Sequence, residues 1–157
     1  MGRRLLLDEL GGRLDDCPGG IRPVGASEEM GRIDMALPQL WQLVGLLAVH
    51  WLADFVLQSH WMSVNKSKRI DALATHVAVY TSTLLVGSGL IFGVRQTAPL
   101  LLFVGVNGLL HFATDFVTSR ITSRLWQLKR EHDFFVVVGL DQLIHQATLA
   151  ATLWFIF

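Results

Sequence analysis

Four apolar stretches, each close to the length of a membrane-spanning helix, constrain this sequence more than any other feature. They lie at about residues 37–58, 72–94, 98–117 and 134–157. An α-helix rises about 1.5 Å per residue, so about 20 apolar residues cover the hydrocarbon core of a bilayer. Hydrophobic residues make up 52% of the chain and charged residues only 17%. We therefore predict an all-α integral membrane protein, a bundle of four transmembrane helices.

The predicted spans contain a repeated motif in which three residues separate a histidine from an aspartate. His50 and Asp54 form the first copy and His111 and Asp115 the second, and both copies read His-x-x-x-Asp-Phe-Val. The fourth span carries the reversed order, from Asp141 to His145. Residues four apart share one face of a helix. Because ionisable groups inside a membrane are costly, these pairs indicate a functional site.

The repeat also predicts the arrangement of the spans. The first and third spans carry the same motif and run in the same direction, which favours two helical hairpins related by a pseudo-twofold axis along the membrane normal. The first and third connections are basic, whereas the second contains only Arg95: Lys66, Lys68 and Arg69 lie in the first, and Arg120, Arg124, Lys129 and Arg130 follow the third span. The positive-inside rule then predicts that the first and third connections face the cytoplasm and that both termini lie outside. The expected location is the bacterial inner membrane.

Residues 1–34 differ from the rest in composition. They mix arginines with acidic residues, Gly and Pro, which predicts a flexible tail. Leu5–Leu7 is too short to be the apolar core of a signal peptide. Met35 offers an alternative start, in which case the tail is an over-extended gene prediction. The single cysteine, Cys17, excludes an internal disulfide, and the zero net charge without a basic face argues against nucleic-acid binding.

Counting helical turns from the predicted cytoplasmic ends places the ionisable residues of the spans in one layer. Buried charges without partners are strongly penalised, so a metal ion is an economical partner for them. Imidazole and carboxylate ligands suit zinc first, with iron or manganese as alternatives. The predicted metal ligands are His50, Asp54, His111, Asp115, Asp141 and His145. This set exceeds one tetrahedral ion, so either two metals or one metal with surrounding carboxylates is expected.

The remaining polar residues of the spans and of the first connection complete the predicted site. His76 is a metal ligand or a general base, and Asp54 is the other predicted catalytic residue. Substrate-binding roles are predicted for Asn107, Gln58, Gln142 and Lys66. A single polar pair between transmembrane helices more often stabilises helix packing than forms a functional site. Three pairs together with His76 in one layer favour a site.

These residues carry a resemblance to a known family. His50-x-x-x-Asp54-Phe55-x-x-Gln58, Lys66, His76, His111-x-x-x-Asp115 and Asp141-Gln142-x-x-His145 resemble the motifs of an uncharacterised family of small bacterial and phage integral-membrane proteins, a domain of unknown function. The resemblance spans residues 43–153 and implies intramembrane His and Asp residues without naming an activity. A looser similarity, at the level of residue types, links the chain to predicted membrane-bound metal-dependent hydrolases.

The function predicted first is a membrane-embedded, metal-dependent hydrolase that acts near the cytoplasmic leaflet on an anionic lipid or phosphoester. A homodimer is expected, because so small a bundle leaves little room to enclose a site. The alternatives are a metal-ion or proton transporter or channel that uses the same residues as a relay, and a non-catalytic membrane factor in which the polar layer holds helices together. The outer halves of the spans carry few ionisable groups, which favours a one-sided site over a conduit.

Overall fold

The computed structural model describes residues 40–93 and 97–157, and every regular element in these ranges is a helix. The first helix, Leu40–Val56, ends in a π-helical turn, η1, at Leu52–Val56. The elements that follow are α3 (His60–Asn65), α4 (Ile70–Phe92), α5 (Thr97–Gln127) and α6 (Glu131–Ile156). The all-α prediction is confirmed for this part of the chain. The predicted tail, residues 1–34, lies outside the described residues.

Three helices, α4, α5 and α6, are long and apolar enough to cross a membrane. Their surfaces agree with a lipid environment, because large apolar side chains point outward: Leu90 is 83% exposed and Leu109 is 75% exposed. Histidines lie inside instead, and His76 is 0% exposed. This distribution is the reverse of a soluble protein, and it indicates a membrane protein. Helix Leu40–Val56 is apolar but shorter than these three, and residues 37–39 of its predicted span lie outside the described residues.

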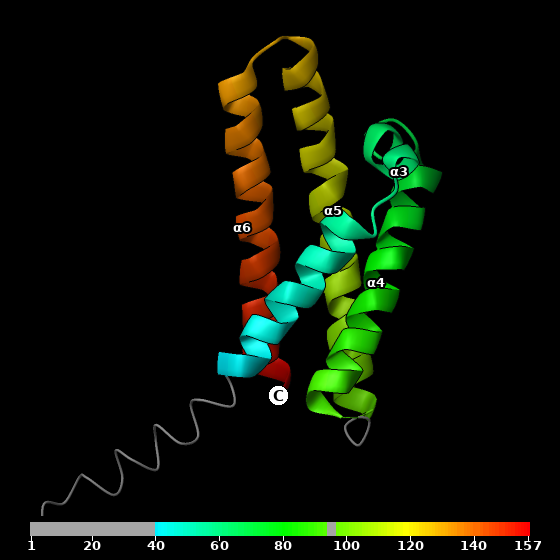
Figure 1. Ribbon diagram of the computed structural model, residues 1–157, viewed down its shortest axis with the longest axis vertical. Helices are drawn as coiled ribbons and strands as arrows, with labels where there is room; N and C mark the ends of the chain where they lie inside the picture. Colours follow the sequence, from blue (N-terminus) through cyan, green and yellow to red (C-terminus); the bar gives the residue numbers. More distant parts are fainter. Residues whose placement is uncertain (1–39, 94–96) are drawn as a thin grey trace, which may run out of the picture. The chain divides into compact units, whose positions relative to one another are not determined.

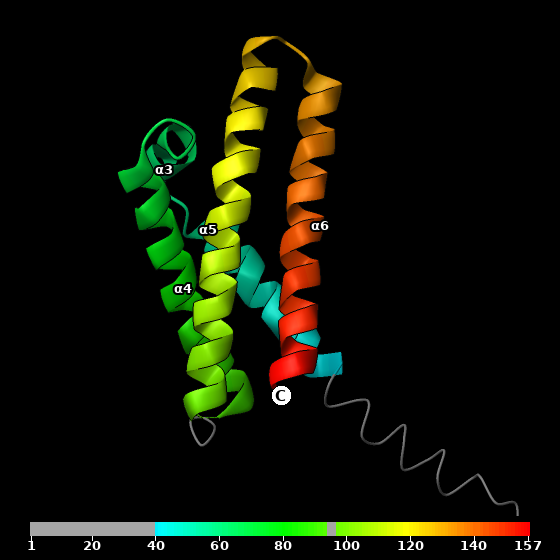
Figure 2. The ribbon, with the colours of Figure 1, turned by 180° about the vertical axis from the view of Figure 1, so that it is seen from behind.

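Helix α5 is the central element of the described residues 40–93 and 97–157. It lies between α4 and α6 and contacts both (Figures 1 and 2). Helix Leu40–Val56 crosses α5 and α6 obliquely on one face, and η1 leads toward α3 (Figure 1). The first helix, α4, α5 and α6 each supply apolar side chains to one core. Examples, in that order, are Leu46, Leu84, Phe103 and Leu149.

Two glycines allow neighbouring helices to approach closely. A Cβ atom placed on Gly87 of α4 would lie 2.5 Å from Val49 Cγ2 on the first helix. A Cβ atom on Gly108 of α5 would lie 2.8 Å from Thr81 Oγ1 on α4. Small residues at helix contacts are typical of membrane proteins, because tight packing replaces the hydrophobic driving force that lipid removes. These contacts bring the polar faces of three helices together.

The helices extend beyond the predicted membrane spans. Helix α5 continues past residue 117, where the third predicted span ends, as one helix to Gln127. Helix α6 begins at Glu131, and its N-cap residue is Arg130. Asp133 lies in the first turn and accepts a hydrogen bond from Arg130 Nε at 2.6 Å. A carboxylate there is favourable because it faces the positive end of the helix dipole.

Candidate functional site

Four buried side chains from η1, α4 and α5 converge on a single point. His76 Nε2 lies 3.1 Å from Asp54 Oδ1, 3.1 Å from Asp115 Oδ2 and 3.1 Å from His111 Nε2. His111 Nε2 lies 3.7 Å from the same oxygen of each aspartate. None of the four residues is more than 4% exposed. We call Asp54, His76, His111 and Asp115 the inner cluster.

Hydrogen bonding alone does not satisfy the inner cluster. An imidazole Nε2 either donates one hydrogen bond or accepts, so His76 cannot pair with three atoms at once. Asp54 Oδ1 and His111 Nδ1 are buried and have no hydrogen-bond partner among the described residues. Four tetrahedral ligands held about 2.0–2.1 Å from a zinc ion are themselves separated by about 3.3 Å. The separations of 3.1–3.7 Å bracket that value, so the donor set fits a metal ion.

A second group of possible ligands adjoins the inner cluster from α6. Asp54, Asp141 and His145 each offer a ligand atom within 4.8 Å of the others. His145 Nε2 lies 3.5 Å from Asp115 Oδ1 and 3.7 Å from Asp141 Oδ2. The imidazole is 2% exposed, and Nε2 has no hydrogen-bond partner within residues 40–93 and 97–157. His145 is therefore a buried, unsatisfied group that points toward two carboxylates.

His50 lies beside these groups rather than within them. Its Nε2 donates to Gln142 Oε1 at 3.2 Å, and the distance to Asp54 Oδ2 is 3.9 Å. Gln142 Nε2 in turn donates to Asp54 Oδ2 at 2.9 Å and to Asp141 Oδ2 at 3.1 Å. His50 thus fixes the amide that holds two carboxylates in place. Partners of this kind orient metal ligands and tune them.

Lys66, the C-cap residue of α3, reaches the inner cluster with its side chain. Its Nζ lies 2.8 Å from Asp115 Oδ2 and 3.5 Å from His76 Nε2. The amide nitrogen of Gln58 lies 3.2 Å from His76 Nδ1 and 3.4 Å from His76 Nε2. Lys66 and Gln58 were both predicted to bind substrate, and the structure places both against the inner cluster.

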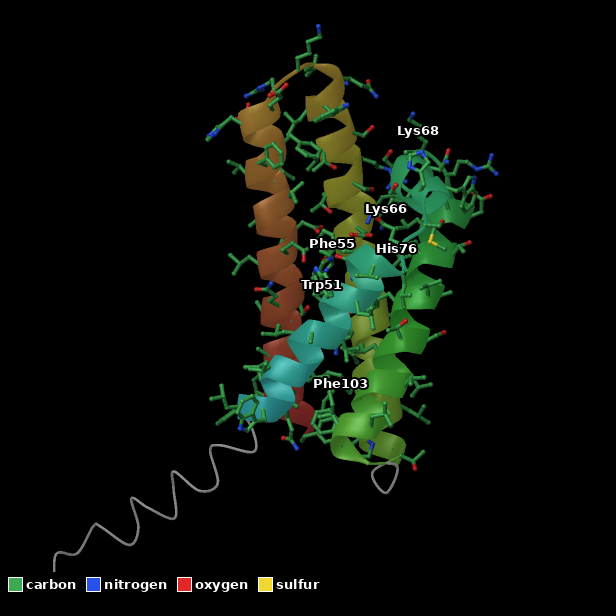
Figure 3. The ribbon with its side chains drawn as sticks, in the orientation of Figure 1. Trp51, Phe55, Lys66, Lys68, His76 and Phe103 are labelled. Atoms are coloured by element: carbon green, nitrogen blue, oxygen red, sulfur yellow. The ribbon has the colours of Figure 1, made fainter. Side chains whose placement is uncertain are left out.

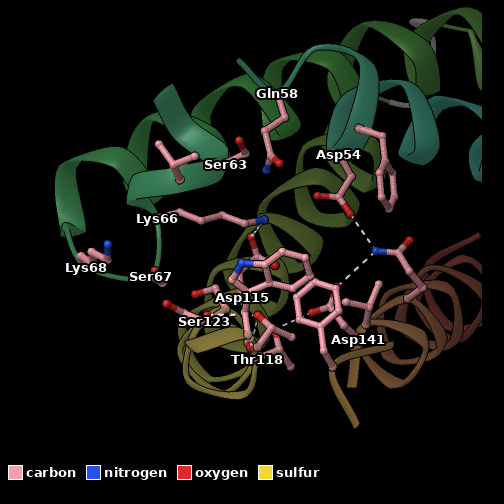
Figure 4. Close-up of a pocket in the computed structure, with 18 of the residues that line it drawn as sticks. Asp54, Gln58, Ser63, Lys66, Ser67, Lys68, Asp115, Thr118, Ser123 and Asp141 are labelled. Carbon is pink, nitrogen blue, oxygen red and sulfur yellow. Dashed lines mark hydrogen bonds and ion pairs between the residues drawn. The ribbon is translucent and has the colours of Figure 1, made fainter. Parts of the chain in front are cut away.

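A pocket of about 550 Å³ joins the inner cluster to the end of the molecule that carries Lys66 and Lys68 (Figures 3 and 4). Asp54, Asp115 and Asp141 line its inner part. Its wall is rich in hydroxyl groups, from Ser63, Ser67, Thr118, Ser119, Thr122 and Ser123, and includes the apolar side chains Phe55, Val64, Trp126, Phe134 and Val138. On the opposite side, the apolar core around Leu84 and Phe103 closes the cluster off. The polar approach is therefore one-sided in the described part of the chain.

Of the four residues predicted to bind substrate, Asn107 does not line this pocket. Asn107 is buried one turn before His111, and its amide donates to Phe103 O at 2.8 Å and to Thr152 Oγ1 at 2.8 Å. It links α5 to α6, and it is not among the residues that line the pocket. Asn107 and His111 are four residues apart and share one face of α5. The pocket, however, lies toward Asp115, on the other side of His111 along the helix.

Three features of the site were not predicted as part of it. Tyr80 stacks on His111, with ring centroids 3.8 Å apart and planes at 7°. Thr118 Oγ1 donates to Asp141 Oδ1 at 2.5 Å. The π-helical turn η1 holds Asp54 and is closed by a hydrogen bond from Leu57 N to Leu52 O. Such turns often mark functional sites, but no spacing in the sequence signals them.

Comparison with known proteins identifies the family. Searches of curated proteins and of solved structures each gave no match. A family model described as "Protein of unknown function (DUF3307)" matches residues 42–157, which include every residue of the inner cluster. The predicted resemblance to an uncharacterised family is thereby confirmed. The chain belongs to the DUF3307 family.

Proposed function

We propose that this protein is a membrane-embedded, metal-dependent hydrolase that acts near the cytoplasmic leaflet on an anionic lipid or phosphoester. The observation that supports it is the convergence of Asp54, His76, His111 and Asp115 at the inner end of a polar, one-sided pocket. Two imidazoles and two carboxylates form a donor set that zinc, iron or manganese accepts. A metal held there would supply an activated water as the nucleophile.

The residues of the chain then have separate roles. In this proposal the inner cluster binds the metal, so His76 is a ligand rather than a free base. Hydrolysis would join the water oxygen to phosphorus and break the phosphorus–oxygen bond to the leaving alcohol, which would take up a proton from water. Asp54, which lines the pocket, would hold the metal on the side from which the substrate enters. Lys66, 2.8 Å from Asp115, places a positive charge where the phosphoryl oxygens would enter.

The pocket wall agrees with an anionic, amphiphilic substrate. Hydroxyl groups and the side chains of Lys66 and Lys68 offer hydrogen bonds and positive charge to a head group. Phe134 and Val138 line the same pocket from α6, where an acyl chain would continue toward the lipid. Basic groups at this end also attract the anionic cytoplasmic leaflet.

We also infer that the molecule crosses the membrane four times as two pseudo-repeated hairpins, with both termini outside. His76 Nε2 supports this inference because it is 3.1 Å from Asp54 and 3.1 Å from Asp115, the two equivalent residues of the repeat. The local conformations differ, because the first copy ends in the π-helical turn η1 whereas the second lies within the longer helix α5. The homodimer stays a prediction.

Metal analysis combined with hydrolysis assays tests the proposed function. We expect the detergent-purified wild type to contain zinc, iron or manganese, and His76→Ala and His111→Ala to lose it. Gln146→Ala is the matched control, because this residue is exposed on α6 next to His145. The metal-loaded wild type should release phosphate from phosphatidic acid or another phosphorylated lipid in mixed micelles, and both variants should not.

Two results would contradict the proposal in different ways. Absence of bound metal from a folded wild type would leave the polar layer as a proton relay or as packing between helices. Bound metal without hydrolysis, but with metal flux into proteoliposomes, would favour the transporter. The one-sided pocket supports the hydrolase over that alternative.

A further inference from the structure

The buried carboxylates of Asp54 and Asp115 each present two oxygens to different neighbours. Asp115 Oδ2 lies 3.1 Å from His76 Nε2, whereas Asp115 Oδ1 lies 3.5 Å from His145 Nε2. Asp54 Oδ1 lies 3.1 Å from His76 Nε2, whereas Asp54 Oδ2 accepts a hydrogen bond from Gln142 at 2.9 Å. One oxygen of each carboxylate thus belongs to the inner cluster, and the other faces α6.

The side facing α6 holds its own set of ligand atoms. His145 Nε2 is buried without a hydrogen-bond partner in the described residues, 3.7 Å from Asp141 Oδ2. Asp141 and Asp54 are drawn toward each other, because both accept from the single amide nitrogen of Gln142 (Figure 4). Thr118 holds the other oxygen of Asp141. His145, Asp141 and Asp54 therefore offer ligand atoms at one position beside the inner cluster, and Asp115 Oδ1 lies 3.5 Å from the same histidine.

We propose that this position is a second metal site, held by His145, Asp141 and the outer oxygens of Asp54 and Asp115, so that the two aspartates bridge a two-metal centre. The proposal rests on the proposed function, since the bridging aspartates belong to the inner cluster. It also gives a role to the third pair, which has the reverse order of the first two: Asp141 and His145 approach the shared carboxylates from α6.

Charge is compatible with two ions when an anionic substrate is bound. Asp54, Asp115 and Asp141 carry three negative charges when ionised, and Lys66 supplies one positive charge at 2.8 Å from Asp115. Two divalent ions would leave the site with a net charge of +2, which an anionic substrate would neutralise on binding, and unbalanced charge is expensive in a low-dielectric interior. Two-metal sites bound largely by carboxylates occur within helical bundles, and a pair of ions about 3.5–4 Å apart stabilises both the attacking and the leaving oxygen in hydrolysis.

Manganese binding to the full-length, detergent-purified protein tests the second site, with Mn²⁺ as the only probe. After removal of metal with a chelator, we expect the wild type to bind two equivalents of Mn²⁺, and its electron paramagnetic resonance spectrum to show the magnetic coupling of neighbouring ions. Asp141→Asn and His145→Gln keep the size of the side chain but weaken the proposed second site. Both should bind one equivalent, with the uncoupled six-line spectrum. Gln146→Ala should behave as the wild type.

The outcomes separate this proposal from the proposed function. One equivalent in the wild type, retained in Asp141→Asn and His145→Gln, would overturn the second site and leave the inner cluster as a single-metal centre. Two equivalents that both variants retain would place the second ion elsewhere and also overturn it. No binding by a folded wild type would overturn both proposals. Circular dichroism and size-exclusion elution in detergent confirm that each variant is folded.

Discussion

Lys66 and Asp115 form an ion pair in the protein interior, with Nζ 2.8 Å from Oδ2, although 49 positions separate them in the sequence. The carboxylate is 2% exposed and the lysine 17%. The pair fastens the end of α3 to the middle of α5 and brings a positive charge into the inner cluster. Lys66 is thus both a structural tie and the basic group closest to Asp115 in the described part of the chain.

Lys66→Met should destabilise the metal-free protein strongly, because it leaves Asp115 buried without its charge partner. Breaking a buried pair typically costs about 3–5 kcal/mol. Addition of Zn²⁺ should reduce the loss, since a bound cation replaces the missing charge. Unfolding of the chelator-treated and Zn²⁺-loaded proteins in mixed micelles measures both quantities. Arg69→Met is the control: Arg69 pairs with Asp71 on the surface, and little change is expected because solvent screens exposed pairs.

Metal removal should lower the unfolding temperature of the wild type. A ligand that binds only the folded state stabilises it by about 2.7 kcal/mol when its free concentration is 100 times its dissociation constant. We expect Zn²⁺ to raise the melting temperature of the wild type in detergent, and to have no effect on His111→Ala. An equal rise in His111→Ala would show that the metal acts outside the inner cluster.

Tyr80→Ala should weaken both stability and metal binding. The tyrosine ring stacks on His111 at 3.8 Å and is 2% exposed, so its removal leaves a cavity beside a proposed ligand. Truncation of a buried aromatic residue costs about 3–5 kcal/mol. Tyr80→Phe keeps the ring and should retain the metal affinity. Isothermal titration with Zn²⁺ compares the three proteins, and equal affinities in wild type and Tyr80→Ala would remove the role of the stack in orienting His111.

Gly87→Ala should destabilise the contact between the first helix and α4. Its Cβ atom would lie 2.5 Å from Val49 Cγ2, and overpacking typically costs about 1–3 kcal/mol. Val49→Ala should rescue it, so that the double variant is more stable than Gly87→Ala alone. Gly105→Ala is a suitable control, because nothing lies within 4 Å of a Cβ there. Additive effects in this double-mutant cycle would contradict a direct contact.

Asn107→Ala should leave metal binding unchanged, although the sequence predicted a role for Asn107 in the site. Its amide donates to Thr152 Oγ1 at 2.8 Å and links α5 to α6. The loss leaves a buried acceptor without its donor, a change that costs about 1–3 kcal/mol. Metal analysis and unfolding in micelles separate the two effects. Loss of metal from a folded Asn107→Ala protein would contradict this prediction and show that Asn107 contributes to the metal site.

Much of the site could be predicted because helical periodicity is a local property. The spacing His-x-x-x-Asp places both side chains on one face whatever the helix packs against, and the cost of burying them in apolar spans pointed to a common layer. Asp54, His76, His111, Asp115, Asp141 and His145 were selected on these grounds, and the structure brings all of them into two adjoining groups.

The errors arise where a decision depends on neighbouring helices. His50 and Asp54 share a spacing with His111 and Asp115, yet η1 widens the first helix at Asp54, and His50 faces Gln142 rather than the inner cluster. The third span was predicted to end near residue 117 because basic side chains mark the edge of the membrane, and α5 continues to Gln127. A helix can continue beyond that edge when it packs against another helix, as α5 does against α6.

The sequence by itself determined that the chain is helical, that its apolar spans suit a membrane, and which residue types share a helix face, because composition and periodicity act within one helix. Only the tertiary structure decided which faces meet. Three contacts illustrate this, because each joins residues on different elements. His76 lies 3.1 Å from both aspartates, Lys66 pairs with Asp115, and Asn107 donates to Thr152 on α6 and does not line the pocket. Such contacts depend on the crossing and depth of packed helices, which close approaches such as that of Gly87 to Val49 set and which no spacing along the chain records.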